Sequence, residues 1–497
     1  MNATRRGLVL LVTTGLITLL ARCAAGSSEP SGEPDPDGLQ AGVAAVPITP
    51  TAQNHPETIY LAGVIPSRVA TGVHDDLLAS ALALKQGGQY VILVSLDLVG
   101  FTRSRGREIQ ERVQVELGLD GERVLIAATH THEGPDTIGV YGANVVTSGT
   151  SPTYMRSVQD AVVEAVRQAW QGLVPVTLRA GNRTLHDPVS NRPTLIGDLR
   201  EPDVTVDHVS VAGFYGLDGL AVATLVNWHS HPEVMIEHTE VSSDFAGSLR
   251  QRMEQLVGGR CVYITGAVGG LSTPTGVAVP ARDEQGQPVL ADDGTPRYLQ
   301  DASWDKVRSL GFVVAEHAAQ ALQEAGDVSA PLFLTRIVPF LVPVRTPLMQ
   351  VAFKAGLVQY DARDLVTDQP DLCGTLGCAS ERLAFVLLGP LGILSSPGET
   401  FPETVVGRPA STVTFGDAGP FPFAAMSGTD ALLERLGVSV PMHLGLCGDE
   451  IAYLVPEGDL HPPGHPDYYE EGLIFAADAE TLYQAAVADL LWADVQR

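Results

Sequence analysis

Two apolar runs joined by an amphipathic segment constrain the fold of this chain more than any other feature. The run "YVILVSLDLVG", from Tyr90, is continuous and rich in β-branched residues, which is typical of a buried strand. The run "RVLIAAT", from Arg123, has the same character, and "SRGREIQERVQVEL" between the two favours a helix. A strand–helix–strand unit favours parallel pairing of its two strands. The sequence therefore predicts an α/β protein.

Strands and helices continue to alternate along the chain. Residues 152–172 predict a helix, because Met155, Val158, Val162, Val166 and Ala169 recur at spacings of three and four. The other predicted elements are a strand in "LAVATLVNWHSH", a helix in "SSDFAGSLRQRMEQLV", a strand in "CVYIT", a helix over 304–325, a strand-rich region over 331–396 and a last helix over 472–492. No repeat and no linker interrupts the chain after about residue 40. We expect one large domain over residues 40–497, with mixed strands and helices in stacked β-sheets flanked by helices.

The N-terminus predicts export. Arg5 and Arg6 precede an apolar run over residues 7–21 that is too short to span a bilayer comfortably. The following "LLARC" resembles a bacterial lipoprotein signal, in which the cysteine, here Cys23, is lipidated. We therefore expect a signal peptide over 1–22, a disordered tether over 23–39, and a lipid anchor that brings the protein into contact with the membrane of the cell envelope. A periplasmic or secreted protein is the alternative.

The charge of the chain limits its possible binding partners, and its cysteines suggest a disulfide bond. The formal net charge of −27 argues against nucleic acid and anionic membrane surfaces as partners. In an exported chain, "CGTLGC" is compatible with a small disulfide loop between Cys373 and Cys378. Buried free thiols are the alternative for these two residues, and the sequence does not fix the pairing among them, Cys261 and Cys447.

Two histidine pairs at strand ends predict a metal site. In "ATHTHEGPD", His130 and His132 stand one residue apart, and in "NWHSHPEVM" the same spacing separates His229 and His231. Because side chains alternate along a strand, we expect both histidines of a pair to point to the same side. Neutral imidazole is the commonest ligand for zinc, and a catalytic zinc needs about three protein ligands and an open position. A further ligand, most simply a carboxylate, is expected from elsewhere in the chain.

The motif "ATHTHEGPD" also resembles the THTHSGP motif of the neutral/alkaline, non-lysosomal ceramidase family. Other segments resemble motifs of that family in the same order over residues 41–490: "AAVPITP", "GVHDDLLASALAL", "SNRPT", "SHPEVM", "SSDFAG", "GAVGGLSTP", "SSPGETFPETVVG", "GLCGDEIAYLVP" and "YYEEG". The resemblance implies a catalytic domain that uses zinc to hydrolyse the N-acyl amide bond of ceramide or of a related N-acyl lipid.

The resemblance also implies roles for individual residues. The zinc ligands would be His130, His231, Glu399 and Tyr453, with His231 preferred to His229 because Met235 follows it at the spacing seen in the family. The remaining expected site residues are His132 as proton shuttle or substrate contact, Tyr453 as stabiliser of the oxyanion, Arg192 and Tyr469 as substrate-binding residues, and Ser272 as nucleophile or carbonyl-binding group.

Two departures from the family pattern bear on the chemistry. Glu133 replaces the usual serine after THTH, and Gly270 stands where the ceramidases carry Asp or Asn near Ser272. Because a serine nucleophile needs a base, the absence of a polar side chain at Gly270 favours attack by water. Two other functions stay open at this point: a different metal-dependent hydrolase such as a phosphoesterase, which would need more Asp ligands, and a non-catalytic lipoprotein of the same fold that binds a lipid or glycan.

Overall fold

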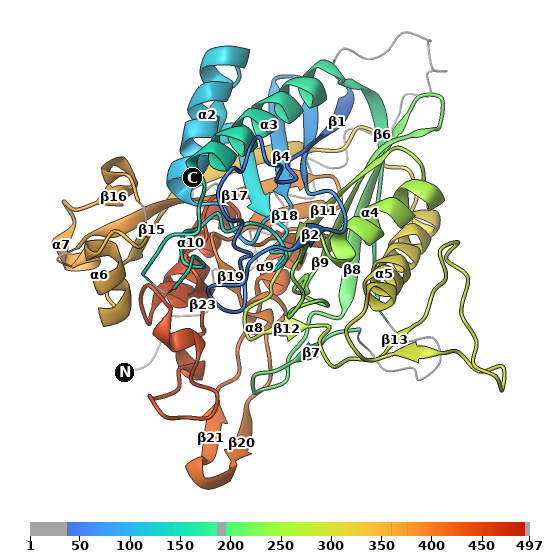
Figure 1. The fold of residues 1–497 in the computed structure, drawn as a ribbon. Coiled ribbons are helices and arrows are strands. Elements are labelled where there is room, and N and C mark those ends of the chain that lie inside the picture. The colour runs from blue at the N-terminus through green and yellow to red at the C-terminus, as the bar shows by residue number, and fades with distance from the viewer. Residues whose placement is uncertain (1–36, 145, 186–194, 359, 375, 493–497) are drawn as a thin grey trace, which may run out of the picture. The chain divides into compact units, whose positions relative to one another are not determined.

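The predicted strand–helix–strand unit is present at one edge of the main sheet. The computed structural model describes residues 37–144, 146–185, 195–358, 360–374 and 376–492 (Figure 1). Strand β4 (Gln89–Leu96) and strand β5 (Val124–Ala128) pair in parallel, and helix α2 (Arg103–Leu117) connects them. Cys23, the signal peptide, most of the predicted tether and Arg192 lie outside the described residues.

The main sheet has eight strands in the order β11-β9-β8-β6-β1-β3-β4-β5. Its other strands are β1 (Leu39–Pro47), β3 (Leu78–Gln86), β6 (Val174–Thr184), β8 (His208–Gly216), β9 (Ala221–Trp228) and β11 (Arg260–Thr265). At the edge opposite β5, β9 and β11 form a second parallel pair, joined by helix α4 (Phe245–Leu256). The sheet has two halves, one formed by β1, β3, β4 and β5 and the other by β6, β8, β9 and β11. They are joined through β1 and β6, which are paired at only two positions, Gln40 with Pro175 and Ala41 with Val174.

The two halves of this sheet share one apolar core with a second sheet. The second sheet has the order β15-β17-β18-β22, formed by β15 (Phe333–Pro343), β17 (Cys378–Leu388), β18 (Leu391–Ser395) and β22 (Val440–Leu444), with β16 (Leu365–Val366) paired to β17. Leu93 of one half, Phe214 of the other half and Val386 of the second sheet belong to the same buried cluster. The prediction of stacked sheets in an α/β fold is confirmed.

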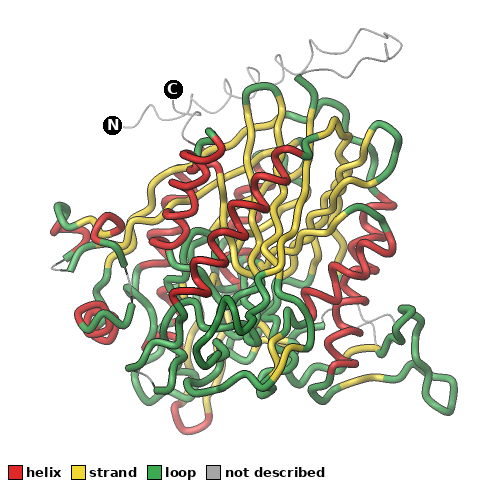
Figure 2. Tube along the Cα trace, turned by 45° about the horizontal axis from the view of Figure 1, so that its top comes forward, coloured by secondary structure: helices red, strands yellow, loops and turns green. Residues whose placement is uncertain are grey.

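Helices cover the outer faces of the strands (Figure 2). Helix α3 (Pro152–Gln171) buries the five predicted apolar positions against β1 and β3, so the predicted helix over 152–172 is confirmed. Helix α5 (Trp304–Glu324) packs with α4 over the half of the main sheet that contains β6, β8, β9 and β11, and α10 (Ala479–Trp492) packs on the second sheet. The last helix begins at Ala479 rather than at Gly472, because residues 470–472 form a 3₁₀ turn instead.

Short elements complete the domain. They are the paired strands β2 (Gly72–Val73) and β10 (Glu240–Val241), β7 (Gly197–Asp198) and β12 (Ser272–Thr273), β13 (Val279–Pro280) and β14 (Tyr298–Leu299), β19 (Glu399–Thr400) and β23 (Tyr453–Leu454), and β20 (Ser411–Phe415) and β21 (Gly419–Phe423), with helices α6 (Pro347–Lys354), α7 (Pro370–Cys373), α8 (Pro402–Val406) and α9 (Thr429–Arg435). Cys373 and Cys378 form the expected disulfide, while Cys261 and Cys447 are buried free thiols. Among the described residues, no helix is both long and apolar enough to cross a membrane.

The main sheet brings the ends of β5 and β9 together. Thr265, at the end of β11, donates a hydrogen bond from Oγ1 to the carbonyl oxygen of Thr129 at 2.6 Å. Thr265 is also the register partner of Trp228, the last residue of β9. The segments that follow β5 and β9 therefore emerge side by side, although the two strands stand far apart in the strand order.

Candidate metal centre

The first histidine motif lies beyond its strand, not within it. Strand β5 ends at Ala128, and His130 adopts a left-handed backbone conformation with φ of 68°. Hydrogen bonds from the amides of Thr129 and His130 to the carbonyls of Leu96 and Leu98, at 2.7 and 2.9 Å, fix this turn. The expectation that strand alternation aligns His130 with His132 is therefore wrong, and the turn itself directs their side chains.

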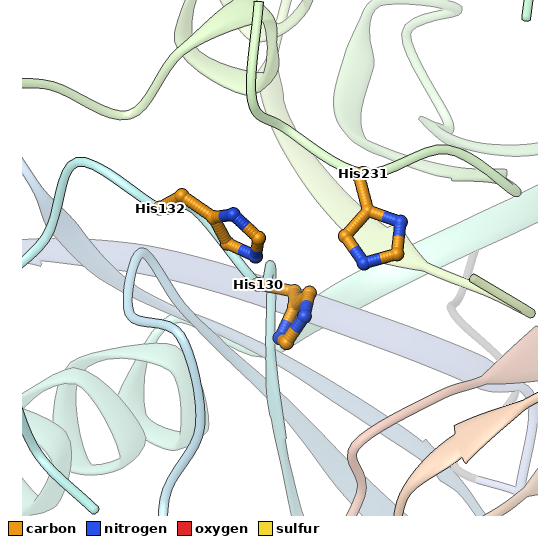
Figure 3. A group of neighbouring side chains, drawn as sticks. All are labelled: His130, His132 and His231. Atoms are coloured by element: carbon orange, nitrogen blue, oxygen red, sulfur yellow. The ribbon is translucent and has the colours of Figure 1, made fainter. Parts of the chain in front are cut away.

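Three histidines from the two motifs converge (Figure 3). The ring centroid of His130 lies 4.9 Å from the ring centroid of His132 and 4.9 Å from that of His231. The ring centroids of His132 and His231 are 5.4 Å apart. One nitrogen of each ring lies within 4.8 Å of the others, and all three residues are buried. The described part of the chain thus contains a histidine cluster able to hold a metal ion.

An oxygen atom holds the Nδ1 atom of each of these rings. His130 Nδ1 lies 2.5 Å from the carbonyl oxygen of Val99, and His231 Nδ1 lies 3.0 Å from the carbonyl oxygen of Ser272. His132 Nδ1 lies 2.9 Å from the carboxylate of Glu233. A carbonyl or carboxylate oxygen accepts a hydrogen bond from an Nδ1–H group, which leaves the lone pair of a neutral ring on Nε2, as in metal-binding histidines. For His130 and His231 the contact is a hydrogen bond, whereas His132 Nδ1 is near its carboxylate without being aligned for one.

Glu399 completes the cluster with a carboxylate. Its Oε1 lies 3.5 Å from His130 Nε2, and its Oε2 lies 3.3 Å from His231 Nε2. Two ligands of a tetrahedral zinc with bonds of about 2.0–2.1 Å are about 3.3 Å apart, so this spacing suits three ligands of one ion. Glu399 Oε2 is buried without a hydrogen-bond partner in the structure, which also fits a cation at this position.

The local electrostatics agree with that arrangement. Burial lowers the pKa of His130 to about 3, although the carboxylate of Glu399 acts in the opposite direction. This low pKa keeps the ring neutral. Burial also lowers the pKa of His231, but the carboxylates of Glu233 and Glu399 outweigh it and raise that pKa to about 9. A bound cation would displace the proton from His231, since metal binding and protonation compete for the same lone pair.

Two tyrosines extend the site. Strand β19 pairs in parallel with β23, and their register places Tyr453 beside Glu399. Tyr453 is buried, and burial raises the pKa of its hydroxyl. The ring of Tyr469 lies 6.1 Å from that of Tyr453 and is half exposed. The structure therefore brings both predicted tyrosines to the histidine cluster.

Two cavities meet at the cluster. The larger, of about 290 Å³, is lined by His130, His132, His231, Glu233, Glu399 and both tyrosines, among others. The smaller, of about 180 Å³, shares His130, Glu399 and the tyrosines but is otherwise mostly apolar, with Val99, Ile138, Val140, Met349, Leu473 and Phe475 in its wall. The candidate metal site lies where these two cavities meet.

Ser272 and His229 lie behind the cluster rather than in it. Ser272 is fully buried, its Oγ donates to the carbonyl oxygen of His229 at 3.1 Å, and it belongs to the lining of neither cavity. His229 Nδ1 accepts a hydrogen bond from the amide of Ala267 at 2.9 Å, and its ring lies near His208 and His443. The structure thus places His231, not His229, beside His130.

Two buried arginines that lie outside the sequence motifs support the site. Arg68 donates to the carbonyl oxygens of Ala62, His132 and Ile236, so it ties the two histidine segments together. Arg200 pairs with Glu470 and Glu471 at 2.6 and 2.7 Å and donates to the carbonyls of residues 459 and 467. It thereby fixes residues 457–472, here called the tyrosine loop because it carries Tyr469. Neither arginine lies in a motif that resembles the family, so only their burial identifies them.

The comparisons with known proteins agree with the motifs. Residues 55–196 match the family model described as neutral/alkaline non-lysosomal ceramidase, N-terminal. Among curated proteins, the chain is 26% identical over 168 residues to a neutral ceramidase of Pseudomonas aeruginosa and 24% identical over 275 residues to one of Mycobacterium tuberculosis. These matches cover 32% and 52% of this chain, but only 25% and 42% of the relatives, so the chain spans less than half the length of either.

Solved structures extend the likeness over most of the described domain. The crystal structure of the neutral ceramidase from Pseudomonas aeruginosa aligns with a TM-score of 0.64 at 18% identity, covering 92% of this chain and 75% of that one. A structure described as ceramidase complexed with C2 aligns with a TM-score of 0.66 at 17% identity, covering 93% and 76%. At such identities these likenesses show a shared fold. The family match, the curated relatives and this fold together support the assignment of the chain to the neutral/alkaline non-lysosomal ceramidase family.

Proposed function

We propose that this chain is a zinc-dependent amidohydrolase that cleaves the N-acyl amide bond of ceramide or of a related N-acyl lipid. The observation that carries the proposal is the carboxylate of Glu399, which lies 3.3–3.5 Å from the Nε2 atoms of two buried histidines at the wall of a cavity. Family membership and the shared fold support amide hydrolysis by analogy.

The zinc would be held by His130, His231, Glu399 and the hydroxyl of Tyr453. Bound there, zinc supplies a Lewis acid that polarises a carbonyl group and lowers the pKa of a water molecule to about 7. The donor set fits this ion, since nitrogen and carboxylate ligands predominate in catalytic zinc sites. Among the described residues, no aspartate lines either cavity at the cluster, whereas a two-metal phosphoesterase would need additional aspartate ligands there.

In the proposed reaction His132 moves the proton. A water oxygen bonds to the carbonyl carbon while one water proton passes to His132 Nε2, and the C–N bond then breaks as this proton passes to the nitrogen. The products are a fatty acid and a free amine. Such acid–base help contributes about 10²–10⁴-fold. Tyr453, at the wall of both cavities, is placed to stabilise the negative charge on the carbonyl oxygen.

The two cavities suggest how a lipid amide is accommodated. The smaller one has a mostly apolar wall, which favours an acyl chain. The larger one holds His132 and the half-exposed Tyr469 and is the natural place for the amine part of the substrate. In this arrangement the amide bond lies at the histidine cluster, where the two cavities share residues.

Metal analysis of purified variants tests the site. The wild-type protein is expected to hold one zinc per chain, and His130→Ala, His231→Ala and Glu399→Ala are each expected to lose it. His229→Asn is the matched control, because its side-chain oxygen can still accept the hydrogen bond from Ala267. Loss of zinc in His229→Asn together with retention in His231→Ala would show that the ligand assignment is wrong.

A substrate panel tests the activity. We expect turnover of N-acyl sphingosines or related N-acyl amides and none of a phosphate ester. Hydrolysis of the phosphate ester alone would favour the phosphoesterase alternative. A zinc-loaded protein that hydrolyses nothing in the panel but binds lipid would favour the non-catalytic alternative.

A further inference from the structure

A buried carboxylate of the second histidine motif contacts the proposed proton shuttle. Glu233 follows His231 by two residues and is almost fully buried. Its Oε2 lies 2.9 Å from His132 Nδ1, and its side chain lies in the wall of the larger cavity. This distance is within the range of a hydrogen bond between a carboxylate oxygen and a ring nitrogen.

A carboxylate at this position restricts His132 to one tautomer. An ionised carboxylate only accepts hydrogen bonds, whereas neutral imidazole donates from one nitrogen and accepts at the other. The close approach of the carboxylate favours the proton on Nδ1 and leaves the lone pair on Nε2, although Nδ1 has no aligned hydrogen-bond partner in this structure and the two groups must reorient slightly to form the bond. It also fixes the direction of the ring, because Arg68 holds the backbone carbonyl of His132 at the same time.

We propose that Glu233 is a positioning residue for the amide hydrolysis, which holds His132 as the Nδ1–H tautomer with Nε2 free to accept the proton. This inference rests on the proposed function for its catalytic meaning, although the tautomer itself does not depend on a substrate. The same physical arrangement occurs wherever a carboxylate bonds to one ring nitrogen of a histidine and thereby orients the other nitrogen, which acts as the general base.

Glu233→Gln is the decisive variant, because a glutamine has nearly the same shape but can donate as well as accept. We expect zinc to stay at one per chain, kcat to fall by about 10–100-fold, the range seen when an orienting partner is lost, and KM to change far less. In protein labelled with ¹⁵N histidine, the Nδ1–H signal of His132, assigned by its absence in His132→Ala, should be lost or mixed with the other tautomer. Glu233→Asp keeps an acceptor and should retain the Nδ1–H signal.

Two further variants separate positioning from a general loss of structure. Glu133→Gln is the matched control, since Glu133 is a buried carboxyl in the adjacent position that contacts Thr131 rather than the His132 ring. It should leave the tautomer and kcat unchanged. If Glu233 acts through His132, the double variant His132→Ala/Glu233→Gln should be no slower than His132→Ala alone.

Each contrary result has a distinct meaning. Loss of zinc in Glu233→Gln would overturn the proposal by showing that the pair supports metal binding and that His132 is itself a ligand. An unchanged Nδ1–H tautomer in Glu233→Gln would overturn it too. If the wild-type protein hydrolyses no amide, the proposed function fails, while the NMR result still decides whether Glu233 sets the tautomer.

Discussion

The substitution Gly63→Ala should disable His132 while leaving the metal ligands in place. Gly63 lies at the wall of the larger cavity with φ of 110°, a conformation that side chains rarely adopt. A Cβ at this position would lie 2.5 Å from Cγ and 2.6 Å from Cβ of His132. Both atoms are close to the backbone, so the imidazole cannot avoid the contact by a simple rotation.

The size of the effect follows from this distance. Carbon atoms in contact are about 3.5 Å apart or more, so the two groups must separate by about 1.0 Å. A misplacement of about 1 Å in a catalytic group can cost about 10²-fold in rate, which is about 2.7 kcal/mol of transition-state free energy. The strained backbone should in addition cost about 1–3 kcal/mol of folding stability.

Steady-state kinetics with an N-acyl amide, metal analysis and urea unfolding together measure these effects. Gly294→Ala is the control, because Gly294 has φ of 82° in an open turn and a Cβ there meets nothing within 4 Å. Both variants should lose stability, but only Gly63→Ala should lose about 10²-fold in kcat/KM with zinc retained. Normal kinetics in Gly63→Ala would refute the placement of His132 beside the reacting bond, and loss of zinc would mean that His132 belongs to the metal site.

Four other predictions concern separate parts of the molecule. Ser272→Ala should slow turnover by about 10–100-fold, because it removes the hydrogen bond to the carbonyl oxygen of His229 that helps to hold the second histidine segment, and a trapped acyl group on Ser272 detected by mass spectrometry would instead make it the nucleophile. Arg200→Met leaves two buried carboxylates of the tyrosine loop unpaired and should cost about 3–5 kcal/mol in urea unfolding, whereas an unchanged midpoint would mean that the loop is held by other contacts. Replacing both Cys373 and Cys378 by serine opens a loop with a sequence separation of 5 and should cost about 2 kcal/mol, a difference that must vanish when both proteins are unfolded under reducing conditions. For the proposed anchor, Cys23→Ser should release the protein from membranes or leave it unprocessed, and a mature N-terminus beyond that residue by intact-mass analysis would exclude the lipid.

Much of the fold follows from local sequence patterns. The apolar runs of β4 and β5 and the segment of α2 between them predict a parallel unit, because a helical crossover returns the chain in the same direction. The five apolar positions of α3 fix its buried face for the same kind of local reason. The last helix is also visible in the sequence, but its start is not, since the turn at residues 470–472 depends on contacts of the tyrosine loop with Arg200.

The composition of the site was likewise visible in the sequence, whereas its geometry was not. The motifs identify His130, His231, Glu399 and Tyr453 as candidates because imidazole and carboxylate groups are the ligands that zinc requires. Strand alternation does not explain their arrangement, because His130 lies in a left-handed turn and His229 points away from its motif partner. Which nitrogen of each ring faces the cluster depends on oxygens that lie far away in sequence or in another motif.

Only the tertiary structure assigns a position to the residues behind the cluster. Glu233 could belong to any buried turn until its carboxylate is seen at His132 Nδ1, and Ser272 resembles a nucleophile until its Oγ is found on the carbonyl of His229. The sequence by itself determined the types of residue that can perform the chemistry, because those types are set by local patterns and by the demands of a metal. The folded sheets decided which of them meet, because the segments after β5 and β9 become neighbours only when the long-range strand pairing of β9 with β11 brings Thr265 to Thr129.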